Sequence, residues 1–153
     1  MNPIRFTSDQ MQMMSLFQRV TKSTARDCVE DEKQDRIIFV VETGKMGLAI
    51  GKGGTNIKSL QNMIKRNVEL VEYNEKPEQV LKNMLNRKLI SDVKITTRPD
   101  GVKQATITVD QGKKGIVVGR EGRNAEKARL LAKRYFDIGY VMINSPQRQA
   151  MGW

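Results

Sequence analysis

Two short glycine-rich segments carry the residue types in this chain with the clearest chemical use. Residues 51–54 read Gly-Lys-Gly-Gly and residues 119–122 read Gly-Arg-Glu-Gly, and a helical pattern begins directly after each. Glycine has no Cβ, so a foreign backbone can approach closely, and the amides at a helix start favour an anion. With a cation between the glycines, Lys52 or Arg120, each segment predicts a site for the sugar-phosphate backbone of a nucleic acid.

Both segments belong to an internal repeat. Residues 41–66 align without a gap on residues 109–134, and nine of the 26 aligned pairs are identical. The identical pairs include four pairs of glycines and three pairs of cations, together with Asn56 and Asn124. A repeated core alone would keep apolar positions, so this repeat predicts a duplicated binding site within a duplicated fold.

Other phosphate-binding motifs do not fit the first segment. A Walker-type loop needs a glycine where Met46 stands, and a Ser or Thr where Gly53 follows the lysine. A dinucleotide fingerprint needs a third glycine where Asn56 stands. The sequence therefore argues against nucleotide hydrolysis and against dinucleotide binding.

Composition narrows the function classes further. The 153 residues include 27 Lys and Arg against 17 Asp and Glu, so the net charge of +10 favours nucleic acid first and an anionic membrane surface second. Histidine is absent and Cys28 is the one cysteine, which excludes zinc ribbons, histidine-dependent triads and a disulfide framework. No run approaches the roughly 18 apolar residues of a membrane span. We therefore expect a cytoplasmic protein that is not an enzyme, with no cofactor, small-molecule substrate or membrane partner.

The charge is unevenly spread along the chain. Residues 1–75 carry a net charge of +1 and residues 76–153 a net charge of +9, yet residues 44–66 hold five cations and no acid. Residues 112–136 hold eight cations and two acids, one of which is Glu121 inside the second segment. We expect Glu121 to point away from a bound phosphate. The alternative, an inward orientation, would weaken the second site.

Hydrophobic periodicity predicts the elements that position the two segments. The first copy reads as a helix over about 9–25 capped by Thr7, a polar stretch at 28–29, an acidic turn at 30–35, a strand at 37–41, a helix through 57–64 and a strand at 68–71. The second reads as a helix from Pro77, a hairpin of strands at 93–97 and 105–109, a helix through 125–135 and a strand at 138–143. Both halves therefore read helix, strand, strand, short helix, glycine loop, helix, strand.

This order resembles tandem KH domains of the prokaryotic, type II arrangement. The glycine-x-x-glycine loop between two helices carries the resemblance, and residues 47–56 (GLAIGKGGTN) are similar to a KH segment of the NusA transcription factors. The resemblance implies an α+β fold of two domains, each helix-strand-strand-helix-helix-strand with a three-stranded sheet packed on helices. We expect the first domain at residues 1–75, the second at 76–145 and a flexible tail at 146–153.

The resemblance also implies recognition of single-stranded RNA, with each loop clamping about four nucleotides beside an aliphatic groove. The RNA-binding candidates are Lys45, Ile50, Gly51, Lys52, Gly53, Gly54, Ile57 and Lys58 in the first copy, and Lys113, Lys114, Val118, Gly119, Arg120, Glu121, Gly122, Arg123 and Lys127 in the second. The candidates for the groove floor are Ile50, Ile57, Val118 and Ala125.

Similarity to the NusA-like termination proteins implies a role in transcription termination or antitermination, with RNA polymerase as a partner. Two alternatives stay open: an RNA-binding factor in ribosome or structured-RNA assembly, and a protein-interaction scaffold whose KH folds no longer need RNA. DNA also stays open as the ligand, because no residue identifies a contact to a 2′-hydroxyl group.

Overall fold

The computed structural model describes residues 4–146 and divides into two compact units between Asn74 and Glu75. Each unit contains one three-stranded sheet packed on helices, as expected for the α+β class. Apart from Pro146, the tail expected at 146–153 lies outside the described residues. Among residues 4–146, no helix combines the length and apolar character that crossing a bilayer requires.

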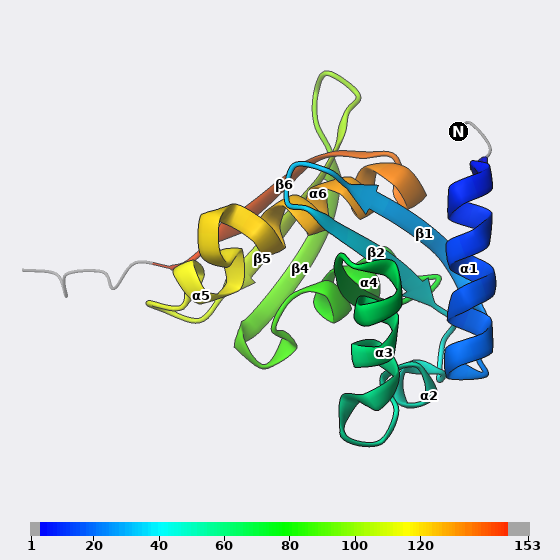
Figure 1. Cartoon of the computed structure of the whole chain (residues 1–153). Coiled ribbons are helices and arrows are strands. Elements are labelled where there is room, and N and C mark those ends of the chain that lie inside the picture. Colours follow the sequence, from blue (N-terminus) through cyan, green and yellow to red (C-terminus); the bar gives the residue numbers. More distant parts are fainter. Residues whose placement is uncertain (1–3, 147–153) are drawn as a thin grey trace, which may run out of the picture. The chain divides into compact units, whose positions relative to one another are not determined.

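The first unit follows the expected helix-strand-strand-helix-helix-strand order. Its elements are α1 (Ser8–Thr21), β1 (Ala25–Asp31), β2 (Arg36–Val41), α2 (Met46–Ile50), a 3-10 turn η1 (Lys52–Gly54), α3 (Thr55–Ile64) and β3 (Asn67–Glu72) (Figure 1). Strand β2 is central, antiparallel to β1 and parallel to β3. A parallel pair needs a crossover connection, which α2, η1 and α3 supply.

The second unit repeats the same topology. Its elements are α4 (Pro77–Met84), η2 (Arg87–Leu89), β4 (Ile90–Thr97), β5 (Lys103–Val109), α5 (Lys114–Val118), η3 (Arg120–Gly122), α6 (Arg123–Phe136) and β6 (Ile138–Asn144). Strand β5 pairs antiparallel with β4 and parallel with β6. The predicted fold class is confirmed, down to the hairpin turn before Lys103 and the proline at the start of α4.

The beginning of the chain departs from the prediction in two places. Helix α1 has the expected capping box between Thr7 and Gln10, but it ends at Thr21 and not near residue 25. Lys22 adopts a left-handed conformation (φ 59°) and caps the helix, so the chain is extended by the time Ala25 pairs with Val41. A left-handed residue is a common helix stop. The stretch at 28–29 is therefore the middle of β1.

The acidic segment at 30–35 is only partly a turn. Asp31 still belongs to β1 and is buried, because the Nε of Arg36 donates a hydrogen bond to its carboxylate at 2.8 Å. The Nη1 of the same guanidinium reaches Glu69 of β3 at 3.0 Å. Arg36 is 0% exposed. A buried charge needs such paired partners, and this one links all three strands of the first sheet.

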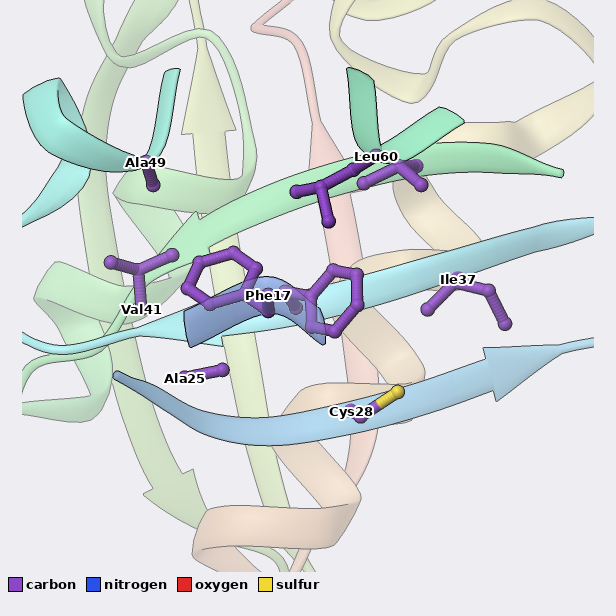
Figure 2. Packing of buried hydrophobic residues seen from close by; sticks show 9 residues of the cluster. Phe17, Ala25, Cys28, Ile37, Val41, Ala49 and Leu60 are labelled. Atoms are coloured by element: carbon purple, nitrogen blue, oxygen red, sulfur yellow. The ribbon is translucent and has the colours of Figure 1, made fainter. Parts of the chain in front are cut away.

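The core of the first unit fixes α2 and α3 on the sheet. Phe17 of α1 packs on Phe39 of β2 with ring centroids 4.8 Å apart. Figure 2 shows these rings within a cluster that Ala49 joins from α2 and Leu60 from α3, each 0% exposed. These two anchors lie on either side of residues 51–54, so the glycine segment is held between two helices that both have a side chain in the core.

Candidate nucleic-acid interface

The two glycine segments adopt the same backbone conformation. The N–H of Gly51 donates to the carbonyl of Gly47 at 3.0 Å, and that of Gly119 donates to Gly115 at 3.1 Å. Within each loop the last glycine closes back on the first, with Gly54 to Gly51 and Gly122 to Gly119 both at 3.1 Å. The sequence repeat is thus a repeat of loop geometry.

The first glycine of each loop is required by both its torsions and its neighbours. Gly51 has φ 75° and ψ 168°, and Gly119 has φ 83° and ψ 168°. This region is almost exclusive to glycine. A Cβ on Gly51 would lie 2.8 Å from Cγ of Asn56, and one on Gly119 would lie 2.8 Å from Nδ2 of Asn124. The asparagine is therefore packed directly against the loop in each copy.

Asn56 contacts the loop through its side chain, although it is not among the candidates predicted from the sequence. Its Nδ2 donates a hydrogen bond to the carbonyl of Leu48 at 2.8 Å, which ties the start of α3 back to α2 across the loop. The identity of Asn56 and Asn124 in the repeat was the signal that pointed to it. We infer that Asn56 braces the loop, since its side chain spans the segment without belonging to it.

Gly53 and Gly122 face open space. Gly53 has φ 66° and Gly54 has φ 77°, both left-handed, and a Cβ on Gly53 would meet no atom within 4 Å. The same is true of Gly122 at φ 73°. Lys52 and Arg120 are exposed. An incoming backbone can therefore approach the loops at Gly53 and Gly122, whereas a Cβ on Gly54 would already lie 3.8 Å from the Ile57 side chain.

Glu121 occupies in the second loop the position that Gly53 occupies in the first. It is exposed and left-handed at φ 56°, ψ 27°, close to the torsions of Gly53. A residue other than glycine is uncommon there. Within residues 4–146 its carboxylate has no hydrogen-bond or ion-pair partner. The expected orientation of Glu121 away from a ligand stays a prediction.

Apolar side chains beside each loop come from the short helices that precede it. In α2, Ala49 is buried whereas Leu48 and Ile50 are 50% and 39% exposed. In α5, Val117 is buried and Ile116 is 58% exposed. The sequence reasoning proposed Ile50 but missed Leu48 and Ile116. Ala49 and Val117 are the buried residues of these five-residue helices, and Leu48, Ile50 and Ile116 beside them are exposed.

The other proposed floor residues lie deeper. Ile57 is partly buried against the first core and Val118 is half-buried. Ala125 is 3% exposed and belongs to the interior of the second unit, so it offers a ligand almost no surface. The exposed apolar edge beside each loop therefore comes from α2 and α5 more than from α3 and α6.

Most of the proposed cations are available to a ligand. The exposed ones are Lys45, Lys52, Lys58, Lys113, Lys114 and Arg120, and Arg123 is half-buried. The Nζ of Lys58 lies 3.5 Å from the carbonyl of Gly53, so this side chain extends along the first loop. Lys127 departs from the prediction, because it is 8% exposed and already has a partner. A buried, partnered ammonium is poorly placed for a phosphate.

One cation of the repeated basic pair has an acidic partner in each copy, at the carboxyl end of the helix that follows the loop. Arg66 bonds to Glu30 at 3.3 Å and lies 3.8 Å from Asp35, and Lys133 bonds to Asp137 at 3.1 Å. This Lys133 contact lowers the pKa of the exposed Asp137 carboxyl from its ordinary value. Arg66 and Lys133 therefore lie at the end of α3 or α6 that is distant from the glycine loop, and each takes part in an ion pair of the fold.

Comparison with known proteins agrees with this architecture. The sequence family described as KH domain matches residues 12–76 and again residues 75–144. A domain pair of this order, with a glycine-x-x-glycine loop in each half, defines a tandem KH protein. The chain also resembles proteins named "Probable transcription termination protein NusA". That of Halobacterium salinarum is 34% identical over 92% of this chain and 98% of its own length, and that of Halococcus morrhuae is 37% identical over 82% and 87%.

A solved structure supports the same assignment. The one titled "Crystal structure of APE1850" superposes with a TM-score of 0.82 at 36% identity, and the match covers 91% of this chain and all of the other. The chain therefore belongs to the KH-domain proteins, and among them to the family of the NusA-like proteins.

Proposed function

We propose that the chain binds single-stranded RNA through both glycine loops and acts in transcription termination or antitermination. The observation that carries the proposal is the duplicated loop geometry, which is exposed to solvent, flanked by cations and packed against an asparagine in both copies. A structural role for glycine turns would not require exposed Lys52 or Arg120 at matching positions.

The geometry suggests how one loop holds a strand. A phosphate would approach the loop where Gly53 leaves open space, next to the amino end of α3 and the side chains of Lys52 and Lys58. Amides at a helix start favour an anion there. The bases would then lie over the exposed apolar edge of α2, formed by Leu48 and Ile50. Recognition of a few unpaired bases beside the clamped backbone is the general KH mode.

The transcription role draws on the names of the relatives, which match this chain over nearly its whole length. Association with RNA polymerase is part of the proposal. Co-purification of polymerase with the tagged chain after nuclease treatment is the test, and retention of polymerase without RNA is the expected result. Crosslinking in cells separates the roles: nascent messenger RNA supports transcription, whereas ribosomal RNA supports the assembly alternative.

A salt titration tests the RNA proposal and counts the loops in use. Log-log plots of affinity against salt fall by about 0.7 per neutralised phosphate on single strands, so four phosphates on one loop give a slope of roughly −3 and two loops up to about −6. Fluorescence anisotropy with a short and a long single-stranded RNA measures both slopes. A duplex RNA of the same length is the control, and equal affinity for the duplex would contradict the proposal.

Exchanging the residues at the loop position where the two copies differ in charge, Gly53 and Glu121, should move RNA affinity in opposite directions in the two copies. Glu121→Gly removes a free carboxylate from the second loop, and Gly53→Glu introduces one into the first. A like charge beside a phosphate at the surface is worth roughly 0.5–1 kcal/mol. We therefore expect a two- to fivefold gain for Glu121→Gly and a comparable loss for Gly53→Glu, measured by anisotropy. A loss of affinity in Glu121→Gly would show that the carboxylate itself contacts the RNA favourably.

A further inference from the structure

A groove in the first unit lies away from its glycine loop. It has a volume of about 460 Å³ and is bounded by one side of α1, the end of β1 and the carboxyl end of α3. Helices α1 and α3 are in contact with each other. The loop precedes α3 and the groove lies by its last residues, so the length of the helix, about 15 Å for 10 residues, separates the two.

The floor of the groove is apolar and rigidly supported. Met13 and Leu16 of α1 and Ile64 of α3 line it, and all three also pack against the core of the unit. Met63 stands at the edge and is 59% exposed. Met63 adds an exposed apolar side chain to the same groove as Met13, Leu16 and Ile64, and methionine adapts its shape to apolar partners.

The charges around the groove argue against a nucleic acid as its occupant. Two acids, Asp9 and Glu30, and two cations, Arg19 and Arg66, line it, so its formal net charge is zero. Residues 44–58, around the loop, hold three cations and no acid. A polyanion would gain no excess positive charge here and would meet two carboxylates, whereas a mixed, neutral rim around an apolar floor suits a protein segment.

Two of these charges are unpaired and lie at opposite ends of the wall that α1 provides. Glu30 and Arg66 bond to each other at 3.3 Å. Within the described part of the chain, however, Asp9 and Arg19 have no ion-pair or hydrogen-bond partner. They are ten residues apart on α1, which places them roughly 15 Å from each other along the helix. An occupant with one cation and one acid at that spacing would pair with both.

We propose that this groove binds a segment of a protein partner that places an apolar or aromatic side chain on the methionine-lined floor. The segment carries a basic residue toward Asp9 and an acidic residue toward Arg19. The site goes beyond RNA binding and does not depend on it, because its residues and those of the loop lie at opposite ends of α3. A partner bound here leaves the loop accessible.

A displayed library of random peptides tests the proposal directly. Peptides of about 12 residues are long enough to span both charges even as a helix. Selection is carried out on the full chain, and binding of the selected peptides is measured by calorimetry. The expected peptides have an apolar anchor between a basic and an acidic residue, and they lose at least tenfold in affinity with Met63→Ser or Arg19→Glu. Both side chains are exposed, so neither change threatens the fold.

The charge pairing is checked by a swap. Replacing the acidic residue of the peptide with lysine should restore binding to Arg19→Glu while weakening binding to the unaltered chain. The selected peptide should also leave RNA affinity unchanged, and Gly53→Asp should leave peptide affinity unchanged. The proposal is overturned if no selected peptide depends on Met63 and Arg19, if the swap restores nothing, or if an RNA displaces the peptide. Each of these results is distinct from a failure of the loops to bind RNA.

Discussion

Lys52→Asp combined with Gly53→Asp is expected to lower single-stranded RNA affinity by roughly 10- to 100-fold while the protein stays folded. The two changes remove a cation that is free to meet a phosphate and place two carboxylates on the loop. A charged hydrogen bond is worth about 1.5–3 kcal/mol, and each 1.4 kcal/mol is tenfold in affinity. The fold should tolerate Asp at 53, because a Cβ there meets open space and Glu121 already adopts the same conformation.

Lys33→Asp is the matched control for the charge change in Lys52→Asp. Lys33 is exposed in the turn between β1 and β2, and that turn lies by the far end of α3, where Asn67 bonds to Asp35. Lys33→Asp should lower RNA affinity only by the small amount that follows from the reduced net positive charge. Anisotropy titrations at two salt concentrations compare the variants, and circular dichroism checks the fold. If the double variant bound RNA as well as the unaltered chain, the scaffold alternative would be the better account.

Gly51→Ala should destabilise the first unit by about 3–5 kcal/mol. The torsions of Gly51 are nearly closed to other residues, which costs about 1–3 kcal/mol on its own. The new Cβ would also lie 2.8 Å from the Asn56 side chain and 3.0 Å from the Asn56 backbone nitrogen. Removing this steric clash requires the Asn56 side chain to move, which breaks its 2.8 Å hydrogen bond to the Leu48 carbonyl. The lost hydrogen bond adds about 1 kcal/mol to the destabilisation.

Gly53→Ala separates the packing effect from the torsional one. Gly53 also has a left-handed backbone, but a Cβ there would have no neighbour within 4 Å. We therefore expect Gly53→Ala to lower the free energy of unfolding by about 1 kcal/mol. Urea unfolding, followed by far-ultraviolet circular dichroism, measures the free energy of unfolding of both variants. Gly119→Ala should behave like Gly51→Ala in the second unit, because Asn124 is equally close. Equal costs for Gly51→Ala and Gly53→Ala would refute the bracing role of Asn56.

The sequence predicts the topology well because the determinants of each element are local. Alternation in β4 and β5, the Thr7 capping box and the glycines of the loops all act through neighbours close in the chain. The repeat shows the same pattern of elements twice in one sequence. This duplication is the reason that a segment of only four residues supports the prediction of a binding loop. The match of both halves to the KH-domain family agrees with this predicted topology.

What the sequence could not supply depends on contacts between distant residues. Arg36 is buried between Asp31 and Glu69, and Glu69 lies 33 positions further along the chain than Arg36. Lys127 looked like an open cation because a helix face cannot be assigned to solvent from spacing alone, and the structure buries it. The groove-floor candidates predicted from the sequence include Ile57 and not Leu48, although Leu48 is the more exposed of the two.

The parallel pairing of β2 with β3 determines what holds the two strands together after proteolytic cleavage of the loop between them. Residues 51–54 lie in the only covalent path between these two strands, as residues 119–122 do between β5 and β6. A protease that cuts either exposed tip would leave the strands held by hydrogen bonds and side-chain packing alone. Bound ligand would shield that tip, so resistance to limited digestion offers a direct, label-free measure of occupancy for each half.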